Sequence, residues 1–254
     1  MRLRLGRPAA LAAAVTAAVA VAVFFSPSAG TATDIHSGTP EYGEVSTIGA
    51  LFTLTAPGEL GTHFCTASVV DSPAGDLVLT AAHCMSGRDV EDVAFVPDYA
   101  GGRAPFGIWT VTGMIMDENW NSSQDPDDDF AFLIVHRAGT SGDVEALTGG
   151  EALGVGETAG RPVEVSGYPD GQNEPIICAN TALAFSPTQF EFYCDGFTDG
   201  TSGSPLLAGA GASTVIGVIG GYEQGGWTPA VSYAARFGTS FASLYRQALA
   251  AAGR

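Results

Sequence analysis

Three segments that lie far apart in the sequence carry residue types that could together perform nucleophilic chemistry. The first is Thr-Ala-Ala-His-Cys at residues 80–84, in which His83 follows an apolar run. An imidazole held in a turn at the end of a strand can act as a general base at neutral pH. A single histidine is more often structural or exposed, so this segment alone predicts no activity.

The second segment is an acidic cluster that abuts an apolar run. Residues 127–129 are all aspartate, and the apolar run at 130–135 has the length of a buried strand. A carboxylate at such a boundary is costly to bury unless it is paired, which makes Asp129 a candidate partner of an imidazole. Asp127 and Asp128 are interpreted as part of a solvated acidic loop or of a calcium site.

The third segment is Gly-Thr-Ser-Gly-Ser-Pro at residues 200–205. Its glycines allow positive φ angles and a close approach of the backbone to a ligand. Ser202 can then present its hydroxyl while nearby N–H groups point at one spot, as an oxyanion requires. Many turns contain Gly-x-Ser-Gly, so the motif gains its weight from the other two segments. Together they supply a base, an orienting acid and a nucleophile in the order His83, Asp129, Ser202.

The elements that must position these residues are mostly short strands. Apolar and β-branched runs alternate with turn clusters rich in glycine and proline. The predicted strands are residues 48–54, 66–70, 77–80, 93–96, 109–116, 130–135, 163–166, 176–178, 182–185, 190–193, 206–207, 215–219 and 231–235. Residues 138–150 are interpreted as a connection, and a helix is predicted at 240–252 with Thr239 or Ser240 as its cap. The pattern indicates two all-β halves, a linker and a terminal helix.

Composition excludes several classes of protein. Of the 254 residues, 46% are hydrophobic and 15% are charged, which excludes a disordered or coiled-coil chain. The ten basic residues, all arginine, are outnumbered by 27 acidic ones, and the net charge of −17 would repel a nucleic acid.

The N-terminus has the pattern of an export signal. Arginines within residues 1–7 precede an Ala- and Val-rich run at 9–25, a proline and a group of small residues. This order predicts a signal peptide at residues 1–32 and a secreted, extracellular protein with no stable membrane association after cleavage. A retained membrane anchor is the alternative. Residues 33–44 are a possible short propeptide or N-terminal extension.

The cysteines are interpreted in the light of secretion. Four are present, namely Cys65, Cys84, Cys178 and Cys194, and an even number outside the cytoplasm favours disulfides. The pairs closest in sequence are Cys65–Cys84 and Cys178–Cys194, but three connectivities are open. A four-cysteine zinc site is a less favoured alternative, because no Cys-x-x-Cys spacing occurs.

The three segments in combination resemble the chymotrypsin-fold, or trypsin-like, serine peptidases over about residues 45–237. The histidine segment matches that family's motif residue for residue, and the serine segment resembles Gly-Asp-Ser-Gly-Gly-Pro with two changes. The Ser-Gly-Ser-Pro form is similar to the bacterial glutamyl-endopeptidase branch. The resemblance implies an all-β fold of two six-stranded antiparallel barrels with a C-terminal helix. The barrels would be residues 45–140, with His83 and Asp129, and residues 141–254, with Ser202.

The resemblance also implies a function and roles for single residues. It predicts a secreted serine endopeptidase that hydrolyses polypeptides through an acyl-enzyme, without a cofactor or metal and as a monomer. Ser202 would attack the carbonyl, His83 would transfer the proton, and Asp129 would orient the imidazole. The amides of Gly200 and Ser202 would hold the oxyanion. A Cys65–Cys84 disulfide would brace the histidine turn.

Two positions depart from the family pattern. Thr201 stands where the family has an aspartate that pairs with a new N-terminus, so we expect the oxyanion loop to form without that switch. The family's spacing places Gly196 at the base of the specificity pocket, where cleavage after Arg or Lys needs an acid. Asp195 and Asp199 lie nearby, and a change in loop length could shift this register, so basic specificity is weakened and stays an alternative. Ile219, Gly220, Gly221 and Tyr222 are predicted to form the far wall, and no histidine appears there to select glutamate. These residues favour an apolar or medium-sized substrate side chain.

Two other functions compete with this prediction. A catalytically silent relative would act as a binding module, and the changes at Thr201 and Ser204 are what would favour it. An esterase of the α/β-hydrolase type would need Gly-x-Ser-x-Gly and a histidine last in chain order. Here Ser204 replaces the final glycine, and His83 comes first. The other histidines are interpreted as structural or exposed, and Trp109, Trp120 and Trp227 as core or loop packing.

Overall fold

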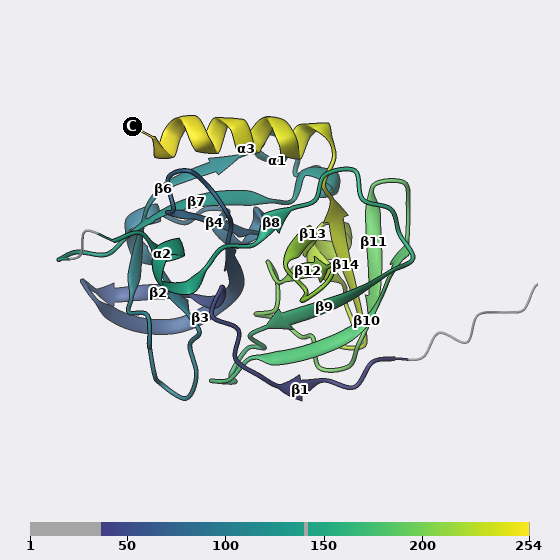
Figure 1. Ribbon diagram of the computed structural model, residues 1–254, viewed down its shortest axis with the longest axis horizontal. Coiled ribbons are helices and arrows are strands. Elements are labelled where there is room, and N and C mark those ends of the chain that lie inside the picture. Colours follow the sequence, from purple (N-terminus) through teal and green to yellow (C-terminus); the bar gives the residue numbers. More distant parts are fainter. Residues whose placement is uncertain (1–36, 140–141, 254) are drawn as a thin grey trace, which may run out of the picture. The chain divides into compact units, whose positions relative to one another are not determined.

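The first half of the chain closes into a six-stranded antiparallel barrel, in the order β2-β3-β4-β7-β6-β5 (Figure 1). The computed structural model describes residues 37–139 and 142–253. The barrel strands are β2 (Ile48–Ala56), β3 (Glu59–Val69), β4 (Leu77–Thr80), β5 (Val93–Pro97), β6 (Trp109–Met116) and β7 (Ala131–His136). Closure leaves no unpaired edge, which suits short, apolar strands.

The second half of the chain, together with the short strand β1 from the N-terminal segment, forms an eight-stranded sheet. Its strands are β1 (Glu41–Tyr42), β8 (Ala152–Leu153), β9 (Arg161–Gly167), β10 (Ile176–Ala184), β11 (Gln189–Tyr193), β12 (Pro205–Ala208), β13 (Thr214–Ile219) and β14 (Val231–Arg236). Antiparallel pairing runs from β9 through β10, β11, β14, β13 and β12 and returns to β9, so six strands complete a ring. The short strands β1 and β8 add to β10 and β13. The chain is therefore mostly β, as predicted.

The C-terminal helix returns from the second sheet to the first barrel. Helix α3 (Thr239–Ala252) lies across β6 and β7 (Figure 1). Phe241 is fully buried between the rings of Phe130 and Phe237, and the hydroxyl of Tyr245 donates to the carbonyl of Asp71 at 2.8 Å. The helix thus holds the two halves together through an apolar stripe with helical spacing.

Several predictions about single elements were wrong. Residues 138–150 contain a short helix, α2 (Val144–Thr148), which forms because Val144 is buried and Glu145 accepts from the amide of Ser72. Helix α3 is capped by Gly238, and neither Thr239 nor Ser240 provides a capping hydrogen bond. Strand β3 begins at Glu59, because a Pro-Gly turn at residues 57–58 joins it to β2 as a long hairpin. The remaining helical segments are α1 (Glu118–Ser123) and the 3-10 turns η1 (His83–Met85), η2 (Val90–Asp92), η3 (Pro126–Asp128) and η4 (Tyr222–Gly225).

The segment that precedes the first barrel pairs with the second sheet. Strand β1 is added to the edge of β10, and the amide of Gly38 donates to the carbonyl of Tyr193 at 3.0 Å. Glu44 accepts from Arg103 of the first barrel at 2.6 Å. Residues 37–44 are thus built into the described fold, whereas the predicted signal peptide at 1–32 and residues 33–36 lie outside the described residues. Among the helices of the described residues, none combines the length and the apolar character needed to cross a membrane.

The buried carboxyl of Glu151 makes stability depend on pH. Glu151 accepts a hydrogen bond from the hydroxyl of Thr47 at 2.6 Å, and only 6% of the residue is exposed. Burial raises the pKa of the Glu151 carboxyl above its ordinary value, although the hydrogen bond opposes this. Because the folded state keeps this proton to a higher pH than the unfolded chain does, this group lowers the free energy of unfolding as pH rises through that range.

We therefore expect Glu151→Gln to stabilise the protein at neutral pH more than at acidic pH. Glutamine keeps an acceptor for Thr47 and removes the charge that burial disfavours. Thermal unfolding at about pH 4 and about pH 7 measures the difference, with Glu59→Gln on an exposed part of β3 as the control. A gain in melting temperature that does not grow with pH would contradict the explanation.

Candidate active site

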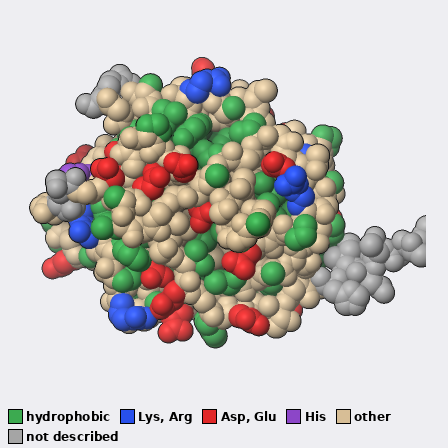
Figure 2. Space-filling view, viewed as in Figure 1, with side chains coloured by type: hydrophobic (Ala, Val, Ile, Leu, Met, Phe, Trp, Pro, Cys, Tyr) green, Lys and Arg blue, Asp and Glu red, His purple; other side chains and the backbone are tan. Residues whose placement is uncertain are grey.

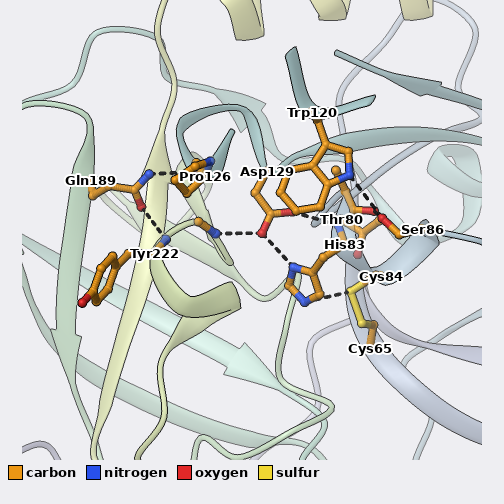
Figure 3. Close-up of polar contacts among 12 residues, drawn as sticks. Cys65, Thr80, His83, Cys84, Ser86, Trp120, Pro126, Asp129, Gln189 and Tyr222 are labelled. Carbon is orange, nitrogen blue, oxygen red and sulfur yellow. Dashed lines mark hydrogen bonds and ion pairs between the residues drawn. A yellow bond between two sulfur atoms is a disulfide. The ribbon is translucent and has the colours of Figure 1, made fainter. Parts of the chain in front are cut away.

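His83 and Asp129 meet because the strands that precede and follow them pair. Strand β4 ends at Thr80 opposite Ala131 of β7, which places η1 beside the end of η3. The Nδ1 atom of His83 lies 2.7 Å from Oδ2 of Asp129, and the amide of His83 donates to Oδ1 at 2.8 Å (Figure 3). A carboxylate can only accept, so Nδ1 carries the proton of a neutral imidazole and Nε2 is left as the acceptor. This is the tautomer that a general base needs.

The carboxylate of Asp129 is fully buried and is satisfied from both halves of the chain. Its side chain is 0% exposed, against 12% for His83. The amide of Gly221, at the end of β13, donates to Oδ2 at 2.8 Å. Gly220 packs so closely on this carboxylate that a Cβ at that position would overlap Oδ2. Three N–H groups therefore stabilise a charge that would be costly to bury unpaired.

A buried glutamine holds the turn before Asp129 against the second sheet. The side-chain amide of Gln189 donates to the carbonyl of Pro126 at 2.9 Å and to Oδ1 of Asp127 at 2.8 Å, and its oxygen accepts from the amide of Tyr222 at 3.3 Å (Figure 3). Asp128 is 6% exposed and accepts from Asn119 at 2.8 Å. The prediction of a solvated loop is wrong for Asp128, which is buried, whereas the calcium site stays a prediction.

The histidine turn is braced from two further sides. Cys65 and Cys84 form a disulfide that ties β3 to η1, and Cys178 pairs with Cys194 in the second sheet. Each cysteine is therefore bonded to the cysteine that was closest to it in the predicted pairs. The ring centroid of Trp120 lies 6.5 Å from that of His83, and its Nε1 donates to Ser86 at 3.2 Å. Among the described residues, Cys65, His83 and Cys84 are the only cluster with metal-ligand spacing, and the disulfide removes the two thiolates that a metal would need.

The loop that carries Ser202 lies directly against the first barrel. The carbonyl of Ser202 accepts a hydrogen bond from the amide of Thr66 in β3 at 2.8 Å. Gly203 has a φ of 84°, and a Cβ there would overlap the carbonyl oxygen of Thr66 and Oγ1 of Thr80. The hydroxyl of Thr66 donates to the carbonyl of Gly200 at 3.0 Å and so sets the orientation of that peptide. The close approach is possible only because position 203 has no side chain.

Two backbone amides of the loop are free to bind a ligand. Within the described part of the chain, no acceptor is bonded to the amides of Gly200 and Ser202, whereas the amides of Thr201, Gly203 and Ser204 are all paired. Gly200 has a φ of 89°. The hydroxyl of Thr201 donates to the carbonyl of Thr198 at 2.7 Å, so this side chain is satisfied inside the loop. Both N–H groups are therefore available to an acceptor supplied by a ligand.

Two adjoining cavities meet at Ser202. One, of about 560 Å³, is lined by His83 and Ser202 together with the Cys65–Cys84 bridge, Arg88 and Trp227. The other, of about 510 Å³, is lined by Ser202, Phe197, Ile219 and residues 224–229. The structure thus places Asp129 against His83, and His83 and Ser202 along one cavity.

The predicted specificity pocket needs correction. Of its five predicted residues only Ile219 lines the 510 Å³ cavity, and Gly196, Gly220, Gly221 and Tyr222 do not. All residues from 221 to 226 except Tyr222 have positive φ angles, so the chain turns back after β13. Gly220 and Gly221 therefore face Asp129, while the ring of Tyr222 packs on Phe185 and Tyr233. Residues 224–229 form the wall instead.

Sequence reasoning missed three residues of the site. Thr66 and Gln189 are buried polar residues whose side chains bond to partners at least 33 positions away in the sequence, and no local motif marks them. Trp227 was interpreted as packing, but it is 82% exposed and lines both cavities. The sequence feature that could have identified Trp227 as a site residue is its position in a glycine-rich loop, close to the expected pocket.

Comparisons with known proteins identify the family and the fold. A family model described as a trypsin-like peptidase domain matches residues 61–218, which is more than half of the chain. No match occurs among curated protein sequences.

Three solved structures share the fold. The protease Anisep from Arthrobacter nicotinovorans is 24% identical, with a TM-score of 0.71, and the match covers 83% of this chain and 99% of that one. A thermostable serine protease, AL20, from an extremophilic microorganism is 24% identical, with a TM-score of 0.68 and coverages of 81% and 97%. A Glu endopeptidase is 17% identical, with a TM-score of 0.66 and coverages of 85% and 98%.

The contact between Gly203 and the first barrel predicts a steric cost for any side chain there. Gly203→Ala is expected to lower the free energy of unfolding by about 2 kcal/mol or more beyond the cost of a positive φ angle. Gly58→Ala is the matched control, because Gly58 has a similar φ of 79° and nothing within 4 Å of the added Cβ. Urea unfolding of both variants measures the difference, and equal losses would contradict the packing described here.

Proposed function

The chain belongs to the family of trypsin-like peptidase domains, and we propose that it is a serine endopeptidase that uses Ser202, His83 and Asp129 as its catalytic residues. The observation that carries the proposal is the buried Asp129 carboxylate behind an imidazole whose Nε2 atom is left as an acceptor, in a cavity that Ser202 also lines. A carboxylate in this position selects the imidazole tautomer and stabilises the imidazolium that forms during catalysis.

The proposed reaction follows from these roles. His83 removes the proton from Ser202 as its hydroxyl oxygen attacks the carbonyl carbon of a peptide, and then gives this proton to the leaving amine. The amides of Gly200 and Ser202 hold the oxygen that becomes negative. Water, deprotonated by the same imidazole, then hydrolyses the acyl-enzyme and regenerates the serine. Thr201 supports this loop by bonding to Thr198, so the proposed oxyanion site needs no new N-terminal ammonium.

The proposal extends to location and partners. Two disulfides suit an oxidising compartment, which supports export directed by residues 1–32 and an extracellular protein.

On the face shown in Figure 2, acidic side chains are spread among hydrophobic and other groups, with only isolated arginines. We expect a monomer that acts on polypeptides and has no nucleic-acid partner. Among the described residues that line the 510 Å³ cavity no histidine occurs, so glutamate selectivity is not proposed.

An active-site label tests the nucleophile. A fluorophosphonate is expected to modify Ser202, and labelling should be lost in His83→Ala because the hydroxyl is too weak a nucleophile without its base. Mass spectrometry of the digested protein identifies the labelled residue. A folded protein that never reacts would favour a catalytically silent binding module instead.

The carboxylate can be tested by its charge alone. Asp129→Asn is expected to reduce kcat by about 10³- to 10⁴-fold, because the amide can donate to Nδ1 and favour the wrong tautomer. Asp127→Asn is the matched control, since its side-chain oxygen can still accept from Gln189, and it should stay within about threefold of the wild type. The rates of peptide hydrolysis by both variants decide whether Asp129 or Asp127 is the carboxylate that catalysis needs.

Protonation of the base predicts the pH dependence. Activity should fall on acidification once the imidazole is protonated, because a protonated imidazole cannot accept the serine proton. The pH profile of kcat/KM for a peptide substrate measures this. Activity that does not fall on acidification of the folded protein would rule out His83 as the base.

A further inference from the structure

Trp227 is a large hydrophobic side chain left in solvent at the mouth of the candidate active site. Its exposed fraction of 82% is the largest among the big hydrophobic residues of the described chain, whereas Trp109 and Trp120 are buried. Trp227 also lines both cavities that meet at Ser202. An indole in water is unfavourable, and its place beside the proposed nucleophile indicates a ligand that covers it.

The backbone that carries this indole is held on both sides. Gly226 has a φ of 119°, and its amide donates to the carbonyl of Glu223 at 3.1 Å. Beyond the tryptophan, the carbonyls of Pro229 and Ala230 accept from the amides of Phe197 and Cys194 at 3.2 and 3.1 Å. Backbone hydrogen bonds therefore hold the segment that carries the exposed ring of Trp227. A ligand that packs on this ring need not pay the entropic cost of ordering the backbone.

The cavity next to Trp227 has a mixed lining of apolar and polar residues, with acidic residues among those that are exposed. Phe197 and Ile219 are only 4% and 2% exposed. Asp170 and Asp199 are exposed lining residues, and no arginine is among the described residues that line this cavity. An apolar side chain that packs on Trp227, Phe197 and Ile219 gains by burial, whereas a carboxylate in this cavity would meet like charges and no arginine of its described lining.

We propose that Trp227 is a specificity-determining residue that packs on an apolar substrate side chain next to the bond attacked by Ser202. Asp170 and Asp199 disfavour an acidic side chain at the same position. The inference rests on the proposed function, because it assigns the substrate preference of that site. A role for this tryptophan in structural packing does not account for its exposure.

Kinetics of Trp227→Ala test the proposal. With acetyl-Ala-Ala-Phe p-nitroanilide we expect KM to rise by about tenfold or more and kcat to stay within about threefold, because burial of a large side chain is lost in ground state and transition state alike. Hydrolysis of p-nitrophenyl acetate, which has no such side chain, should stay within about twofold. Trp227→Phe keeps an aromatic face and should restore most of the affinity.

Controls separate a local effect from a general one. Tyr42→Ala removes another exposed aromatic residue, 72% exposed on β1, and should leave both substrates unaffected. The wild type should also cleave the corresponding Glu p-nitroanilide with a kcat/KM at least about tenfold below that of the Phe substrate. Normal fluorophosphonate labelling with an unchanged KM in Trp227→Ala would overturn this inference alone. Absence of labelling in the folded wild type would overturn the proposed function itself.

Fluorescence provides a test without turnover. In Ser202→Ala, acrylamide quenching should report Trp227, because the other two tryptophans are buried. Acetyl-Ala-Ala-Phe amide, at concentrations above the measured KM, should reduce this quenching as it covers the indole. Ser202→Ala combined with Trp227→Phe should show little quenching with or without the peptide. Quenching in Ser202→Ala that the peptide does not reduce would contradict packing on this ring.

Discussion

The buried charge of Asp129 is the constraint on which the rest of the site depends. A fully buried carboxylate is stable only where N–H groups surround it, and here two come from His83 and one from Gly221. The same hydrogen bonds fix the orientation and tautomer of the imidazole. Because Gly221 lies in the turn that follows β13 of the second sheet, satisfying this one charge also joins the two halves of the molecule at the site.

The surroundings of Asp129 explain why several apparently minor residues are held so firmly. Gln189 connects the turn before Asp129 with the turn after β13, and Gly220 allows the backbone to touch the carboxylate. The resulting turn uses five residues with positive φ angles. Its course moves Gly220 and Gly221 away from the cavity and brings residues 224–229, including Trp227, to it. The electrostatic requirement at Asp129 and the shape of the proposed substrate site are therefore linked.

The serine loop obeys a second, steric constraint. Thr66 contacts this loop through its amide and its hydroxyl, and Gly203 leaves no room between the loop and the first barrel. The paired amides of Thr201, Gly203 and Ser204 leave those of Gly200 and Ser202 available. We therefore expect the packing of the first barrel on this loop to hold its shape without a charged switch near Thr201.

Local patterns in the sequence determined the strand-rich class, most strand positions and the three segments with His83, Asp129 and Ser202. Such features depend on neighbouring residues, so apolar runs, turn residues and short motifs reveal them. The sequence left three disulfide connectivities open, whereas the tertiary structure pairs Cys65 with Cys84 and Cys178 with Cys194. Only the tertiary structure placed the amide of Gly221 against a carboxylate 92 positions earlier in the chain. It also decided the cavity wall, because backbone angles and long-range contacts, rather than residue spacing, direct the chain after Ile219.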